Sequence, residues 1–510
     1  MIWRKRSLSV VLFLLFGALS GPAPAAAIPD PLKPLHVISR LGFGSDPGQV
    51  EKIQTMGIEK YIAAQLAPDS IPESDKLTRQ LNELKTLGLN PAQLFQEYGP
   101  PRAMRGQKPD PEAIKAARER ARAIVQEAAR ARLLRAIESP RQLQEVMVDF
   151  WFNHFNVFAD KGLDQLWVGA YEREAIRPFA LGRFYDLLSA TAHHPAMLFY
   201  LDNWQNTAPD SPGARGKLQG INENYARELM ELHTLGVNGG YTQTDVVALA
   251  HILTGWGLQR PQSRAKGSQG FYFDAKRHDF SDKIFLSRPI KGGGLAEGEE
   301  ALAILARHPA TARHISNKLA QYFVADEPPA GFVERLSKAF IDSDGNIRTV
   351  LNTLFHSPEF WEQRYYGHKF KTPYHYVVSA VRASGLSVNN TQPLNGILRQ
   401  LGMPLYGCLT PDGYKNTEQA WLNPDAMMRR LSFVTVLANG RLPLSNQETV
   451  GPAGVMSVVK QPSAETPSVD VLQLTRALPG LSAQTQAAID IAPASLRAAL
   501  MLGSPEFMRY

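Results

Sequence analysis

The chain has 510 residues, of which 44% are hydrophobic and 20% are charged, and this balance excludes disordered, collagen-like and coiled-coil classes. Its formal net charge of +7 is only weakly basic for this length. The single cysteine, Cys408, excludes an internal disulfide framework and a cysteine-rich metal cluster.

The first 27 residues have the pattern of a secretory signal peptide. Residues 4–6 are Arg-Lys-Arg, residues 10–16 are apolar, and residues 25–27 are alanines of the kind a signal peptidase accepts. The apolar run is shorter than the roughly 20 residues that span a bilayer, which favours cleavage over an uncleaved anchor. Cleavage removes three cations and no acids, which lowers the formal charge from +7 to +4. We therefore expect a periplasmic or secreted protein with no transmembrane helix after cleavage and no nucleic-acid partner.

Helical periodicity dominates the remaining chain and predicts a mainly α fold, a large multi-helix globular body with one small β-hairpin insertion. Apolar residues alternate in two short runs on either side of His278 and Asp279, which places the hairpin near residues 270–287. Four divisions are expected: the signal peptide at 1–27, an N-terminal helical region and connector at 28–110, a central helical body at 111–440, and a C-terminal helical tail packed on that body at 441–510.

An alanine- and arginine-rich segment, residues 112–138, predicts one long helix. Alanine and aliphatic side chains mark one face of it. The opposite face carries four arginines: Arg118, Arg122, Arg132 and Arg135. We interpret these arginines as a solvated basic face, and a binding site for acidic polymers or headgroups is the alternative.

Residues 149–157 combine hydrophobic side chains that are expected in the core with polar side chains that are candidates for a site. His154 falls on the same helical stripe as the neighbouring hydrophobic residues and should face inward. A core histidine held by one hydrogen bond and a ligand or proton carrier are the two interpretations. Asn153 lies elsewhere on this turn, and Asp202 with Asn203 forms a second polar candidate between hydrophobic stretches.

The helix expected at residues 222–235 carries several charged side chains at helical spacing. Glu228 and Glu231 are candidate catalytic groups, because neighbouring carboxylates can raise one another's pKa enough for acid–base work. His233 is a candidate assisting group on the same helix. The alternative is a surface helix laced by salt bridges at i, i+4 spacing. The candidate binding residues here are Glu223, Asn224 and Arg227.

A turn-rich loop at residues 401–414 presents two tyrosines, Tyr406 and Tyr414. Such a loop can offer aromatic rings to a glycan or peptide, or its prolines and tyrosines can pack against helices as a structural cap. The sequence contains no His-Glu-x-x-His, Gly-x-Ser-x-Gly, phosphate-binding glycine loop or EF-hand pattern. It therefore identifies no metal ligand and no cofactor.

Several motifs in order along the chain resemble one family. They include Arg40–Gly44, Asp149–Val157, Asn222–Val237, Leu253–Trp256, and Pro404–Gly407 with Pro411–Tyr414. Together they look like the bacterial family of exported proteins called domain of unknown function 1800. The resemblance implies a predominantly α-helical secreted or periplasmic protein without a settled activity or agreed catalytic residues. It also implies a functional partner, because such proteins are often encoded beside an exported family that resembles sulfatases.

Two functional hypotheses remain open at the level of the sequence. The first is an accessory or binding module for an envelope partner protein or polymer. The alternative is a hydrolase or lyase acting on envelope or extracellular polysaccharide, with Glu228 or Glu231 as acid or base and His154 or His233 assisting. Convergence of these side chains in one cleft favours chemistry, and dispersal over the surface favours a structural helix.

Overall fold

The computed structural model describes residues 32–101, 110–216, 218–259, 270–445, 448–450, 456–458 and 468–510. The expected signal peptide, residues 1–27, lies outside these ranges. Within them, no helix combines the length and the apolar character that crossing a bilayer requires. The mainly α fold is confirmed, because helices dominate the described chain and its strands are short antiparallel pairs.

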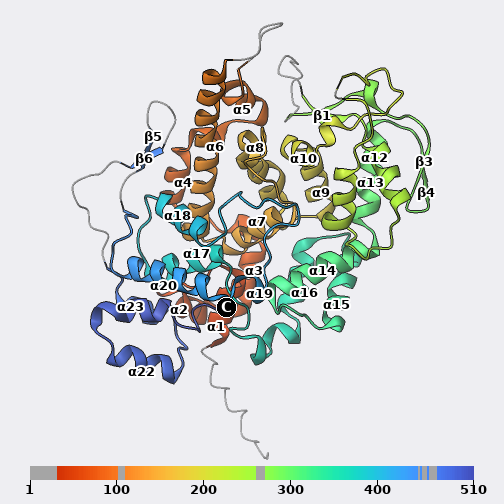
Figure 1. The fold of residues 1–510 in the computed structure, drawn as a ribbon. Helices are drawn as coiled ribbons and strands as arrows, with labels where there is room; N and C mark the ends of the chain where they lie inside the picture. Colours follow the sequence, from red (N-terminus) through yellow and green to blue (C-terminus); the bar gives the residue numbers. More distant parts are fainter. Residues whose placement is uncertain are drawn as a thin grey trace, which may run out of the picture.

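The N-terminal helices pack beside the C-terminal part of the chain (Figure 1). Helix α2 contacts α21, α3 contacts α16, and the Arg40 guanidinium lies over the ring of the last residue, Tyr510, 4.9 Å from its centroid. Gly57, with φ of 92°, separates α2 from α3. These helices are α1 (Leu32–Leu41), α2 (Gln49–Met56), α3 (Ile58–Leu66), α4 (Asp75–Asn82) and α5 (Pro91–Tyr98).

The long helix α6 (Pro111–Glu138) begins where the Asp110 side chain accepts a hydrogen bond from the Glu112 amide at 3.0 Å. It packs closely on α8 (Asp164–Tyr171), because a Cβ at Gly169 would lie 2.8 Å from the Ala128 Cβ. Helix α7 (Gln142–His154) follows α6 and is also buried against it. The interpretation of the four arginines as one solvated face is wrong. Arg118 and Arg122 are exposed, Arg132 is buried and Arg135 is partly buried, because only the N-terminal part of α6 leaves the body.

The β insertion differs in its pairing from the expected hairpin. Strand β2 (Phe271–Phe273) pairs with β1 (Trp256–Leu258), while β3 (Lys283–Phe285) pairs with β4 (Arg288–Ile290). The two runs at residues 271–273 and 284–286 therefore do not pair with each other. A third antiparallel pair joins β5 (Glu448–Val450) to β6 (Met456–Val458). The helices around this region are α9 (Phe184–Ala192), α10 (Pro195–Tyr200), α11 (Asn224–Glu228) and α12 (Gln243–Ile252).

From α13 onward, the described chain forms helices and loops, apart from β5 and β6. Helices α14, α15 and α16 pack on one another, and α20 packs on α23. The bounds are α13 (Leu295–Ala306), α14 (Pro309–Phe323), α15 (Ala330–Asp342), α16 (Ile347–Phe355), α17 (Pro373–Ser384), α18 (Gln392–Gln400), α19 (Glu418–Trp421), α20 (Pro424–Ala438), α21 (Val471–Ala477), α22 (Ala483–Ile491) and α23 (Ala494–Leu502).

Short helical turns connect these elements. Two of them, η3 (Glu172–Ile176) and η6 (Leu229–His233), are π-helical continuations of α8 and α11. The 3₁₀ turns are η1 (Pro68–Ser70), η2 (Lys85–Gly88), η4 (Arg177–Phe179), η5 (Asn203–Gln205), η7 (Ala275–Arg277), η8 (Pro358–Trp361) and η9 (Gln363–Tyr365).

One continuous cluster of buried hydrophobic side chains extends from α1 to the residues after α23. It includes the large buried rings of Trp151, Trp256 and Tyr376. The division of the chain at residues 110 and 440 stays a prediction.

Candidate functional site

His154 lies at the end of α7 and is 2% exposed, as the helical stripe predicts. Lys318 on α14 donates a hydrogen bond from Nζ to His154 Nδ1 at 3.0 Å. Since Nδ1 accepts, Nε2 carries the proton and donates to the carbonyl oxygen of His233 at 3.0 Å. His154 thus joins α7, α14 and η6 inside the protein.

Two more imidazoles surround this contact. The ring centroids of His233 and His314 lie 6.0 and 6.2 Å from that of His154. His314 bonds through Nε2 to the carbonyl oxygen of Leu232 at 3.2 Å. We call His154, His233, His314 and Lys318 the imidazole–lysine cluster. The sequence signal for the two α14 members was only their i, i+4 spacing, which is too common to identify a site.

Burial controls the protonation of this cluster. Desolvation lowers the pKa of His154 well below its usual value, and lowers those of His233 and His314 to about 3 and about 4. Burial, and then Lys415, lower the pKa of Lys318 to about 8 against the opposing effect of Asp412. The three imidazoles are therefore neutral at pH 7. Within the described chain, no group of three or more His, Cys, Asp or Glu side chains is arranged to hold a metal ion.

The carboxylates of α11 and η6 precede His233 on the same helical segment but differ in their partners. Burial, followed by the charges of Glu231 and Asp412, raises the pKa of Glu228, while Arg227 opposes this. Glu228 makes no side-chain hydrogen bond within the described residues, whereas Glu231 accepts one from the Tyr241 hydroxyl at 3.4 Å. Glu228 is thus the one of the two whose environment suits proton transfer.

The other candidates near α11 make local structural contacts. Arg227 pairs with Glu223 at 3.0 Å, and Glu223 also accepts from Gln243 at 2.7 Å. Asn224 donates to the carbonyl oxygen of Leu201 at 3.2 Å.

The candidates in the turn after α10 also make local structural contacts. Asp202 pairs with Lys161 at 2.9 Å. Asn203 is 1% exposed and donates to the carbonyl oxygens of Leu253 and Trp256 at 3.3 and 3.1 Å. Of these candidates, the structure brings His154 and His233 into contact, while Asp412 acts on the pKa of both Glu228 and Lys318.

The loop at residues 401–414 is held by two asparagines, one in the last turn of α7 and one just after the helix. Asn153 donates to the Tyr414 carbonyl oxygen and accepts from the Tyr414 amide, both at 2.7 Å. Asn156 donates to the carbonyl oxygens of Cys408 and Thr410 at 3.0 and 2.9 Å. These bonds explain why amides recur at this end of α7.

The two tyrosines of the loop face the protein. Tyr406 is 3% exposed, and its hydroxyl donates to Glu172 at 2.9 Å. The Tyr414 hydroxyl donates to the carbonyl oxygen of Pro404 at 3.0 Å. These contacts match the structural-cap interpretation, since both hydroxyls already donate to acceptors within the protein.

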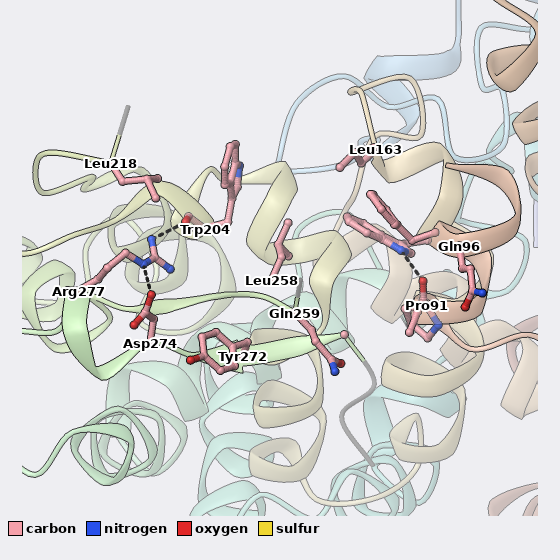
Figure 2. Close-up of a pocket in the computed structure, with 14 residues that line it drawn as sticks. Pro91, Gln96, Leu163, Trp204, Leu218, Leu258, Gln259, Tyr272, Asp274 and Arg277 are labelled. Atoms are coloured by element: carbon pink, nitrogen blue, oxygen red, sulfur yellow. Dashed lines mark hydrogen bonds and ion pairs between the residues drawn. The ribbon is translucent and has the colours of Figure 1, made fainter. Parts of the chain in front are cut away.

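A separate cleft of about 460 Å³ opens between α5 and α8 on one side and η5, β1 and β2 on the other (Figure 2). We call it the aromatic cleft. Its aromatic walls are Phe95, Trp167, Trp204 and Tyr272. Phe95 stacks on Trp167 with centroids 6.2 Å apart, and Phe199 behind the wall stacks on Trp204 at 5.8 Å. Tyr272 is 44% exposed.

Polar groups border these rings at one end of the cleft. Arg277 donates to the carbonyl oxygen of Trp204 at 2.9 Å and its Nε lies 3.3 Å from an Asp274 carboxylate oxygen (Figure 2). The indole Nε1 of Trp204 is buried and has no hydrogen-bond partner among the described residues. A largely apolar hollow with a few oriented polar groups is the usual form of a ligand site. In the sequence, Trp204 stands out only as an aromatic residue inside a polar loop.

Comparison with curated proteins and with solved structures gives no match. The family described as "Protein of unknown function (DUF1800)" matches residues 36–509, which is nearly the whole chain and includes all the site residues above. The expected resemblance is confirmed: the chain belongs to the DUF1800 family of proteins of unknown function.

Proposed function

We propose that the protein is an exported accessory module that binds a carbohydrate polymer of the cell envelope or its surroundings in the aromatic cleft. Export is supported by the leader pattern of residues 1–27. The observation that carries the binding role is the cleft itself, about 460 Å³ in volume and lined by the rings of Phe95, Trp167, Trp204 and Tyr272.

The chemistry of the cleft favours a sugar over a purely apolar ligand. Aromatic faces are electron-rich and attract the C–H groups on the flat face of a pyranose ring. Asp274 and Arg277 at the border can accept from and donate to sugar hydroxyls. A polymer also suits a cleft that is open at the surface, because the chain can continue beyond the residues that are bound. The exported sulfatase-like partner stays a prediction from the family.

Affinity electrophoresis tests this proposal. The protein without residues 1–27 is run through native gels that contain dextran, xylan, alginate or solubilised peptidoglycan. We expect at least one polymer to retard the protein. Trp204→Ala removes a stacking face, so we expect it to weaken retardation at least about tenfold in apparent Kd.

Trp421→Ala is the matched control, because Trp421 is also a half-buried indole but lies outside the cleft. It should be retarded like the unmodified protein. The proposal is refuted if no polymer retards the protein, or if the two tryptophan variants behave alike.

A second candidate function is that of a hydrolase or lyase acting on a polysaccharide. The environment of Glu228 is the observation that favours it. Its raised pKa and free carboxylate suit a general acid. The test compares product release by Glu228→Gln and by Glu223→Gln, which changes a glutamate of the same segment that is paired with Arg227. Loss of activity in Glu228→Gln alone supports catalysis, and equal turnover removes Glu228 from any catalytic role.

A further inference from the structure

A second hollow, of about 360 Å³, lies between η2, α6 and the α8–η3 segment. We call it the α6–η2 pocket. Leu84, Leu87 and Ala131 supply apolar wall, while Lys85 and Arg135 are among the cations that line it. Its volume is within the usual range for small-molecule sites. It is distinct from the aromatic cleft, so a ligand bound in it is independent of the proposed function.

Arg135 distinguishes this pocket from an ordinary surface hollow. Its guanidinium is partly buried and makes no side-chain hydrogen bond or ion pair with any described residue. A guanidinium has five N–H donors in a planar fork, and those of Arg135 are not among the buried polar atoms of the described chain that lack a partner, so solvent in the pocket reaches them. The fork is therefore available to a ligand that enters the pocket.

The neighbouring cations are already occupied. Arg177 donates to both oxygens of Glu145, at 2.6 and 2.9 Å, and to Glu172 at 3.3 Å. Arg173 donates to the carbonyl oxygens of Leu87 and Leu89. Arg173 also pairs with Glu174, so both arginines already have acceptors within the protein.

Glu172 is the carboxylate in the pocket wall, and donors within the protein already compensate its charge. Glu172 accepts from Arg132 at 3.3 Å and from the Tyr406 hydroxyl at 2.9 Å, in addition to Arg177. It therefore offers no strong repulsion to an entering anion.

The neighbouring charges inside the protein do not restore the pKa of Arg135 to its usual value. Burial and then Arg177 lower the pKa of Arg135, and Glu145, Glu172 and Glu73 do not fully offset them. Arg135 therefore has no ion-pair partner of its own among the described residues, and Lys85, exposed on η2, adds a second cation at the rim.

We propose that the α6–η2 pocket binds the oxyanionic group of a small molecule, a carboxylate, phosphate or sulfate, with Arg135 as the bidentate ligand and Lys85 at the entrance. The arginine fork matches the spacing of two oxygens on such a group. Leu84, Leu87 and Ala131 then contact an apolar stem when the ligand has one.

Calorimetric titration of the protein without residues 1–27 tests this assignment. The probes are inorganic phosphate, butyl phosphate, butyrate and the neutral n-butanol, all at one ionic strength. We expect one saturable site for a phosphate probe and none for n-butanol. Tighter binding of butyl phosphate than of inorganic phosphate identifies a group on an apolar stem, and equal binding identifies a free anion.

Variants connect the binding to the two cations. Arg135→Gln should weaken Kd at least about tenfold, because a charge-assisted bidentate contact is lost. Arg118→Gln, on the exposed part of the same helix, should leave Kd unchanged. Lys85→Gln changes an exposed residue and should weaken Kd a few-fold.

The assignment is overturned if no oxyanion binds saturably, if n-butanol binds as tightly as butyl phosphate, or if Arg135→Gln binds like Arg118→Gln. If circular dichroism shows that Arg135→Gln does not fold, the affinities of Arg135→Lys and Lys85→Gln test the assignment instead. Weaker binding by both supports the site, and unchanged affinity in either refutes the role given to that residue.

Discussion

Five buried histidines make the stability of this protein depend on pH below neutrality. Desolvation is the largest cause that lowers the pKa of each. The pKa falls to about 3 for three of them and well below the usual value for the other two. They are His36, His154, His194, His233 and His375, none more than 5% exposed.

The direction of the effect follows from proton binding. Between the lowered pKa of the folded state and the usual value of about 6.5, the unfolded chain binds a proton that the folded chain does not. The free energy of unfolding is therefore largest above about pH 6.5 and decreases as the pH falls. From pH 7 to 5.5 each such histidine removes about 1.3 kcal/mol, and five independent ones remove about 6 kcal/mol. This is a large part of the 5–15 kcal/mol that is typical of a folded domain.

His233→Leu isolates one of these contributions. The leucine is of similar volume, removes the buried Nε2 that has no partner among the described residues, and leaves the backbone carbonyl that accepts from His154. We expect the loss of unfolding free energy between pH 7 and 5.5 to become smaller by about 1.3 kcal/mol. Urea denaturation at both values, followed by tryptophan fluorescence and by circular dichroism, measures it. Coincident transitions are required for a single free energy.

The control is His368→Leu, which removes an exposed imidazole outside the buried set. Its loss between the two pH values should equal that of the unmodified protein. The reasoning is refuted if the unmodified protein loses no stability between pH 7 and 5.5, or if His233→Leu loses as much as the control.

Two further substitutions probe how the site and the insertion are held. Gly413→Ala should destabilise the protein by at least about 2 kcal/mol, because φ is +72° and the new Cβ would lie 2.2 Å from the carbonyl oxygen of Asn153. Urea denaturation measures this loss. Glu297→Ala should cost about 3–5 kcal/mol in the same assay, because Glu297 is buried and accepts from Lys283 at 2.8 Å, whose charge would remain buried without it.

Each of these substitutions has a matched control. Gly402 also has positive φ, of 81°, but a Cβ there would meet nothing within 4 Å, so Gly402→Ala should cost less than Gly413→Ala. Glu300 is exposed on the same helix as Glu297, and Glu300→Ala should change stability by less than about 0.5 kcal/mol. Equal losses within either pair would contradict the packing argument.

Local signals predicted individual helices well. The segment expected at residues 112–138 is α6, and the helix expected at residues 222–235 is α11 with its continuation η6. Both depend on interactions within a few residues, which a sequence displays directly. The pairing of the strands could not be read in this way. The partner of β2 lies before it, at residues 256–258, and alternation marks a strand without identifying its neighbour.

The candidate site likewise has a part that the sequence predicted and a part that it could not predict. Helical periodicity placed His154 inside, but it did not indicate Lys318, which is 164 residues away and determines which nitrogen of the ring carries the proton. Likewise, Arg118 and Arg135 share a helix face by spacing, yet one is exposed and the other lines a pocket. The body that covers the C-terminal half of α6 is built from distant segments, so the face pattern alone could not distinguish them.

The sequence by itself determined the helical class, the family and the positions of individual helices such as α6, because these depend on spacing and on motifs that are contiguous in the chain. The tertiary structure alone decided the imidazole–lysine cluster, the aromatic cleft and the α6–η2 pocket. Each of them joins elements that are far apart in sequence, and burial, which sets the pKa values and leaves Arg135 without an acceptor in the described chain, exists only once those elements have packed.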